Sequence, residues 1–157
     1  MKHKKIESLM SPAKQRLLEL EKTGKYFFHS SPDEIEKFET RQASNWVSGV
    51  KEKDGEPGVF ASPSIDYAIA MSLLTTNLDV ITSAESKEAE KFTIRFFVSQ
   101  DTFKSLNPET KGYVYIFNKD DFPIKNGPSE FKSLVPVTLL EKSIVTKKDL
   151  PEYIEIK

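Results

Sequence analysis

The chain contains no cysteine, only two histidines and only six glycines among its 157 residues. Without cysteine there is no disulfide, thiolate nucleophile or cysteine-ligated metal, and two histidines cannot form a three-histidine site. The scattered glycines form neither a Gly-x-Gly-x-x-Gly nor a Gly-x4-Gly-Lys-Ser/Thr loop. We therefore expect no metal site, no hydride transfer on a Rossmann fold and no P-loop phosphoryl transfer.

The chain also lacks an excess of one charge and a long apolar run. Its 23 basic and 24 acidic residues give a net charge of −1, whereas general nucleic-acid binders and anionic-membrane binders carry a basic excess. No apolar run approaches the roughly 18 residues of a membrane helix, and the N-terminus lacks the apolar core of a signal peptide. We expect a cytoplasmic protein with no membrane partner and no general nucleic-acid binding.

What is present fits one folded domain. Hydrophobic residues make up 38% of the chain and aromatic residues 11%, which is typical of a globular core. We see no repeat or linker, so we predict a single domain over residues 1–157, with residues 1–10 as a flexible or helical N-terminal extension.

The first half predicts two helices, each next to a short strand. Ser11-Pro12 at the start and Gly24 at the end predict a helix, and the aromatic residues 26–30 then predict a strand that ends near His29. Residues 58–62 predict a second strand that runs directly into a helix.

In that second helix, over residues 63–74, Ser62 is the expected N-cap and Pro63 the expected first residue. The face expected to be buried contains Ile65, Ala68, Ile69, Ser72 and Leu73.

The second half predicts mainly strands. Residues 91–98 alternate between apolar and polar, and residues 112–117 are apolar on both faces, which favours a central strand. Residues 118–123 predict one helical turn, and residues 130–133 and 136–146 predict two closing strands. Helices gather in the first half with little regular βαβ alternation, so the predicted fold class is α+β.

Residues 36–57 show no clear period, and we predict a long loop whose charged run at 51–56 is a solvated lid. Trp46 in this loop is either a small core anchor or a ligand-stacking residue. Arg41 is a candidate for pyrophosphate, whereas Arg95 on a polar strand face is expected in a surface ion pair.

Three short segments, taken in order, resemble the ADP-ribosyltransferase-like fold superfamily. They are Tyr-Phe-Phe-His-Ser-Ser at 26–31, Val-Phe-Ala-Ser at 59–62 with its immediate helix, and the late Glu-Phe-Lys-Ser at 130–133. The superfamily includes mono- and poly-ADP-ribosyltransferases, RNA 2′-phosphotransferases and small bacterial proteins, and the resemblance covers about residues 25–149. It implies a split β-sheet core, with an N-terminal helix and a helix after the second strand.

The resemblance also implies roles for individual residues. His29 matches the histidine that hydrogen-bonds the nicotinamide ribose, and Ser30 matches the position that meets the carboxamide. Glu130 matches the catalytic glutamate, with Glu141 as an alternative candidate. The second-strand motif that leads into the helix beside the nicotinamide pocket corresponds to Phe60, Ala61 and Ser62.

Tyr67, in the helix that follows, and Arg41 complete the expected site. The implied activity is that of an NAD-dependent glycosyltransferase, in which NAD is a co-substrate whose N-glycosidic bond to nicotinamide is cleaved. The ADP-ribose is then transferred to an unidentified macromolecular acceptor. A carboxylate near the ribose suits this chemistry, because positive charge develops on the sugar as the bond breaks.

Two alternatives remain open. The first is a non-catalytic nucleotide- or protein-binding domain of the same fold, which is favoured by serine rather than glycine at position 30 and by the early position of Tyr67 in its helix. The second is an RNA 2′-phosphotransferase-like enzyme, for which Arg41 and Lys25 would supply basic groups.

Overall fold

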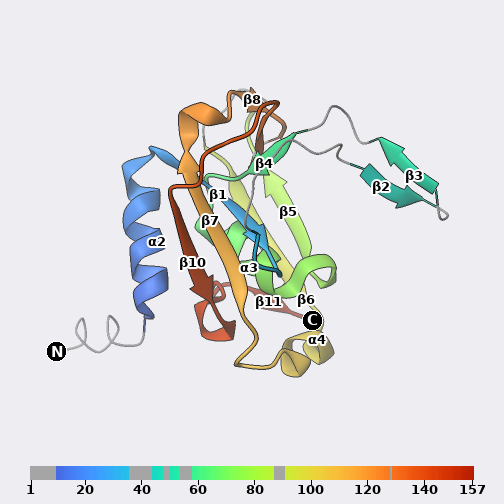
Figure 1. Ribbon diagram of the computed structural model, residues 1–157. Coiled ribbons are helices and arrows are strands. Elements are labelled where there is room, and N and C mark those ends of the chain that lie inside the picture. Colours follow the sequence, from blue (N-terminus) through green and yellow to red (C-terminus); the bar gives the residue numbers. More distant parts are fainter. Residues whose placement is uncertain (1–9, 36–43, 48–49, 54–57, 87–90, 128) are drawn as a thin grey trace.

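The computed structural model of the chain describes residues 10–35, 44–47, 50–53, 58–86, 91–127 and 129–157 (Figure 1). For residues 44–47 and 50–53 it describes the course of the backbone alone. Within these ranges the structure is α+β, as predicted, with its strands arranged in four small sheets. The same ranges contain no helix that is long and apolar enough to cross a membrane.

The helix α2 (Pro12–Thr23) begins and ends as predicted. The Ser11 side chain caps its first turn, and Gly24 ends it in the left-handed region at φ 68°. The Ser11 hydroxyl also donates to the Asp149 carboxylate at 2.6 Å, so the start of the helix is tied to the C-terminal part of the chain.

The central sheet contains β1 (Tyr26–Ser31), β7 (Gly112–Asn118) and β10 (Glu141–Val145). Strand β7 lies in the middle, and both neighbours are antiparallel to it. This position was predicted, because the strand is apolar on both faces, and residues 114–117 are indeed all buried.

A second sheet contains β4 (Val59–Ala61), β9 (Phe131–Ser133) and β8 (Ile124–Lys125), which pair antiparallel in that order. It meets β1 through one isolated antiparallel bridge between Phe28 and Ser62. In this bridge each N–H donates to the carbonyl of the other residue, at 2.7 and 2.8 Å. A single residue pair therefore joins the two sheets.

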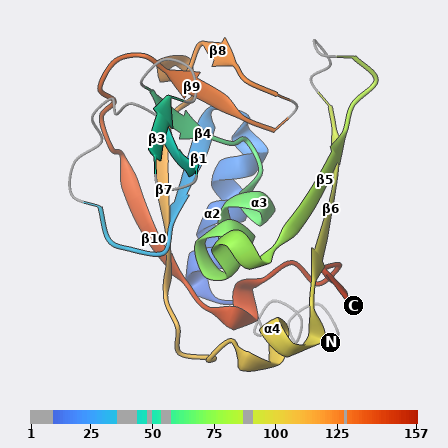
Figure 2. The same cartoon turned by 90° about the vertical axis from the view of Figure 1, so that its right-hand side faces the viewer.

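A third sheet contains β5 (Asp79–Ser83), β6 (Thr93–Val98) and β11 (Glu155–Ile156), with β6 in the middle. Figure 2 shows the helix α3 (Ile65–Leu74) between this sheet and the central sheet. The remaining elements are the antiparallel pair β2 (Ser44–Val47) and β3 (Val50–Lys53), the helix α4 (Gln100–Ser105) and the 3-10 turns η1 (Thr75–Asn77), η2 (Lys119–Asp121) and η3 (Lys147–Asp149).

The hydrophobic core has two clusters, because successive residues of a strand point to opposite faces. Phe28 belongs to the larger cluster, which α3 shares with β6 and β7, whereas Phe27 belongs to a smaller cluster with β4 and β7. The five residues predicted for the buried face of α3 are all buried, and the alternation predicted for residues 91–98 appears in β6.

The predicted start of α3 is wrong by two residues. The N-cap is Ser64, whose side chain accepts a hydrogen bond from the Tyr67 N–H, and the helix begins at Ile65. The reason is the bridge to Phe28: the Ser62 carbonyl, which in an N-cap accepts the first hydrogen bond of the helix, already accepts from the Phe28 N–H.

Other boundary predictions also failed. The expected long loop contains the paired strands β2 and β3, so the loop prediction is wrong for residues 51–53. Residues 54–56 lie outside the described part, and the lid role stays a prediction. Residues 136–140 form no strand, and the last strand of the central sheet starts only at Glu141. The elements β5 and α4 were not predicted.

Candidate functional site

A pocket of about 200 Å³ opens where β1, β4 and the helix α3 come together. It brings together seven of the eight residues selected from the sequence, which are His29, Ser30, Phe60, Ala61, Ser62, Tyr67 and Glu130. The eighth, Arg41, lies outside the described residues.

Strand pairing explains why distant segments meet at this pocket. His29 follows Phe28, which is bridged to Ser62 at the end of β4. Strand β4 in turn pairs with β9, and Ala61 lies opposite Phe131, so Glu130 extends this register to the level of Ser62. The three strands therefore place one candidate residue each at the same edge.

The structure fixes the hydrogen-bonding roles of His29. Its Nδ1 lies 2.5 Å from the carbonyl oxygen of Phe60, and because a carbonyl can only accept, Nδ1 carries the proton. In the neutral ring Nε2 is then an acceptor. Burial lowers the pKa of His29 below its ordinary 6.5, and the bond to Phe60 opposes this only in part, so the ring is neutral at pH 7.

The Glu130 carboxylate is oriented by the turn that connects β8 to β9. Asn126 donates from its side-chain Nδ2 to Oε1 of Glu130 at 2.7 Å, and from its backbone N–H to the Glu130 carbonyl at 2.8 Å. The pKa of Tyr67 is raised by burial and, to a lesser extent, by the negative charge of Glu130. The charge of Glu130 therefore acts on the Tyr67 phenol across the pocket.

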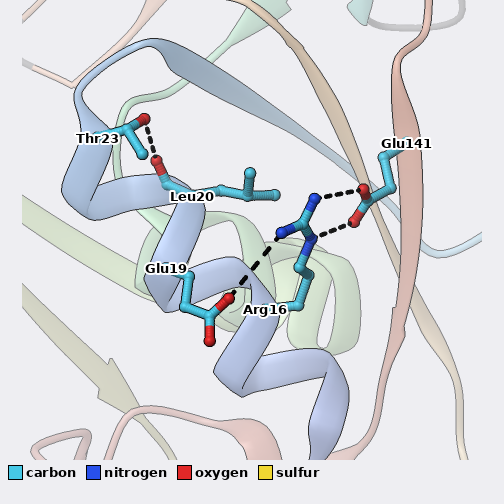
Figure 3. A network of polar contacts seen from close by, with 5 residues as sticks. All are labelled: Arg16, Glu19, Leu20, Thr23 and Glu141. Atoms are coloured by element: carbon cyan, nitrogen blue, oxygen red, sulfur yellow. Dashed lines mark hydrogen bonds and ion pairs between the residues drawn. The ribbon is translucent and has the colours of Figure 1, made fainter.

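The alternative glutamate, Glu141, has a different environment (Figure 3). The Arg16 guanidinium of α2 donates to both of its carboxylate oxygens, at 3.2 and 3.1 Å, and also lies 3.9 Å from Glu19. Glu141 does not line the pocket. Among the described residues, Glu130 is thus the glutamate that lines the pocket together with His29.

Ser62 has a structural role other than the expected helix cap. Its hydroxyl accepts a hydrogen bond from the Ser64 N–H at 3.1 Å, which shapes the turn between β4 and α3. Its side chain also lines the pocket beside Ser30 and Phe60.

Sequence reasoning missed two contributors to the site. Met71 lines the pocket from α3, and its spacing of four residues from Tyr67 could have revealed it, since such residues share a helix face. Asn126 orients Glu130, but it sits in a turn whose pairing depends on β8 and β9, and no local pattern marked it.

Two further predictions concern residues outside the pocket. Arg95 forms the expected surface ion pair, a bidentate contact with Glu155 at 3.0 and 2.9 Å. Trp46 lies in β2, where the structure describes the backbone alone, so both of its predicted roles stay predictions.

The chemistry of the lining suits a neutral or cationic aromatic ring attached to a sugar. Phe28, Phe60 and Tyr67 supply aromatic surface, His29 supplies an acceptor, and Glu130 is the charged residue among those that line the pocket in the described part. No group of three or more His, Asp or Glu residues in the described ranges could hold a metal ion.

Comparison with known proteins gave no match to any protein-family model, curated protein or solved structure.

Proposed function

We propose that the chain is an ADP-ribosyltransferase-like protein that binds NAD through its nicotinamide riboside half in this pocket. It cleaves the N-glycosidic bond to nicotinamide and transfers ADP-ribose to a macromolecular acceptor. The observation that carries the proposal is the convergence of His29, with its protonated Nδ1 on the Phe60 carbonyl, and the Asn126-oriented carboxylate of Glu130 in one aromatic pocket.

The size of the pocket supports binding of only part of the dinucleotide. At about 200 Å³ it lies below the roughly 300–1,000 Å³ of sites that enclose a whole drug-sized ligand. The nicotinamide ring and part of its ribose would fill it, and the adenosine half would lie outside.

Each polar residue has a defined task in this proposal. The Nε2 of neutral His29 accepts a hydrogen bond from a ribose hydroxyl and holds the sugar without transferring a proton. The Glu130 carboxylate stabilises the positive charge that develops on the ribose, an effect that is strong because Asn126 has already oriented it. Phe60 and Tyr67 offer faces for stacking on the ring.

Calorimetric titration with NAD tests the binding step, and release of nicotinamide measured by chromatography tests the chemistry. We expect wild type to bind at millimolar NAD or better, and His29→Ala to bind about tenfold more weakly, the loss expected for one good hydrogen bond. Identical heats for both proteins would contradict the proposal.

A non-catalytic nucleotide-binding domain of the same fold is the second candidate. It is favoured by Ser30, which lines the pocket at a position where many members of the superfamily have glycine, since glycine allows closer approach of a ligand to the backbone. NAD binding by wild type without nicotinamide release would support this candidate.

RNA 2′-phosphotransfer has less support, because the described lining of the pocket contains no basic side chain to meet a phosphate.

A further inference from the structure

A second concave surface, of about 390 Å³, lies at the end of β9 that is farther from Glu130. We call it the β9 groove. Its walls come from the turn η2, the start of β8 and the chain that follows β9, and they include Asp120, Asp121, Ile124, Leu134 and Val135.

The groove exposes apolar side chains that the fold does not bury. Leu134 is 40% exposed and Val135 is 62% exposed, although neither is charged or polar. The Ser133 hydroxyl donates to the Val135 carbonyl at 2.8 Å and accepts from the Val135 N–H at 3.2 Å, so this stretch is held in a fixed turn. Contiguous exposed apolar residues beside a polar rim are typical of a binding surface.

The polar rim of the groove is negatively charged. The side chains of Asp120 and Asp121 form no ion pair and no hydrogen bond within the part of the chain that the structure describes. A partner with a basic group beside an apolar one would pair its charge with Asp120 and Asp121 and cover the exposed Leu134 and Val135.

Strand β9 connects this groove to the proposed active site. Glu130 precedes the strand and Leu134 follows it, so their Cα atoms are separated by four residue steps, about 13 Å for extended chain. A polypeptide that docks in the groove can thus reach the pocket with about four extended residues.

We propose that the β9 groove docks the protein acceptor of the transferase, through a segment that presents Lys or Arg beside an apolar side chain. This proposal rests on the proposed function. It also predicts that the modified side chain lies about four residues from the docking segment.

The binding step is tested without NAD. A random peptide library displayed on phage is panned against the wild-type chain, with Asp120→Asn/Asp121→Asn/Val135→Ser as the counter-target. All three side chains belong to the groove and none belongs to the apolar clusters, so the variant keeps its core. We expect enrichment of sequences with a basic residue next to an apolar one. No enrichment over the counter-target, or an acidic consensus, would overturn the proposal.

A selected peptide is then measured by fluorescence anisotropy. Asp120→Asn/Asp121→Asn should weaken its binding about tenfold, and high salt should weaken binding to wild type. The matched control is Glu109→Gln/Glu152→Gln, which removes two negative charges from exposed positions outside the groove. This control should bind within twofold of wild type, and an equal loss in both variants would contradict a specific groove.

Measuring transfer of ADP-ribose to the selected peptide distinguishes a failure of the proposed function from a failure of acceptor docking in the β9 groove. With NAD present, the aspartate variant should raise KM for the peptide and leave peptide-independent nicotinamide release unchanged. If wild type releases no nicotinamide, the proposed function fails while the peptide result stands. If transfer to the peptide occurs with the same KM in both proteins, acceptor docking in the β9 groove is refuted.

Discussion

Glu130 and Glu141 lie near the start of two late strands of the same protein, yet their surroundings differ completely. Glu130 precedes β9, lines a pocket with His29 and receives a hydrogen bond from a neutral amide. Glu141 begins β10, lies against α2, and both of its oxygens are bound by the Arg16 guanidinium. One carboxylate is oriented by an uncharged donor, and the other is paired with a cation.

The difference shows what makes a carboxylate useful for chemistry. An amide donor fixes the direction of the group without cancelling its charge, whereas a bidentate guanidinium satisfies the oxygens and lowers their attraction for a developing cation. Under the proposed function the pocket side of the molecule is the reactive one, and the α2–β10 side is a structural contact.

The largest expected effect comes from exchanging each glutamate for glutamine. Glu130→Gln should lower the rate of nicotinamide release about 100-fold, because the stabilising charge is lost while the shape is kept. Glu141→Gln should retain the rate within twofold. The two rates are measured by chromatography at saturating NAD, and a large loss in Glu141→Gln would reverse the comparison.

Acidification should affect the pocket through His29. Since burial lowers the pKa of His29 below 6.5 in the folded protein, the unfolded chain binds the proton more readily. The stability from the neutral ring is complete above pH 6.5 and is lost as pH falls through the lowered pKa.

We therefore expect the urea midpoint of wild type to fall on acidification below pH 6.5, and His29→Gln to show a smaller fall. His3→Gln, which removes the other histidine, should follow wild type. Parallel curves for wild type and His29→Gln would show that His29 does not titrate in this way.

The N-caps of two helices extend the comparison: Ser64 caps α3, which lines the pocket with Glu130, and Ser11 caps α2, which carries the Arg16 partner of Glu141. Ser64→Ala should reduce the free energy of unfolding by about 1 kcal/mol, the usual loss for a serine N-cap. Ser11→Ala should reduce it by more, because the Ser11 hydroxyl also donates to the buried Asp149 carboxylate. Ser64→Ala should also weaken NAD binding, because α3 carries Tyr67 and Met71 into the pocket. Ser11→Ala should bind NAD as wild type does, which urea unfolding and calorimetry on the same samples will show.

The smallest expected effect is that of the ion pair in Figure 3. Arg16 is exposed, and exposed pairs contribute little to stability and are screened by salt. Arg16→Gln should lower the melting temperature less than either cap variant, and the difference from wild type should shrink at high salt. A loss larger than that of Ser11→Ala would mean that the α2–β10 contact is more than a surface pair.

The sequence predicted which segments line the pocket better than it predicted where the helices and strands begin and end. The strands at 26–31 and 59–61 and the buried face of α3 follow from local pattern, since aromatic runs, capping residues and helical spacing act over a few residues. The seven predicted residues that line the pocket come from these segments, from Ser62 directly after β4 and from Glu130. The superfamily resemblance that selected them stays a prediction.

The failures have a common physical cause, which is that they depend on pairing between distant segments. Ser62 is as good an N-cap residue as Ser64 in isolation, and it is the bridge to Phe28 that occupies the carbonyl with which Ser62 would start the helix. Strand β5 owes its strand form to pairing with β6. Residues 136–139 were predicted as strand but pair with no strand among the described elements, and the contact with β7 begins at Leu140, whose N–H donates to the Ile116 carbonyl. The strand and helix propensities of single residues do not show which distant segments pair with each other.

The single bridge between Phe28 and Ser62 also has a mechanical consequence. Two backbone hydrogen bonds of this bridge and the His29–Phe60 hydrogen bond join the central sheet to the β4-β9-β8 sheet at the edge where the pocket opens, so a small rotation of one sheet against the other would change the width of the pocket. We therefore expect the Phe28–Ser62 bridge to open in the same motion that widens the pocket around His29. The exchange rates of the Phe28 and Ser62 amide protons with solvent measure how often the pocket widens.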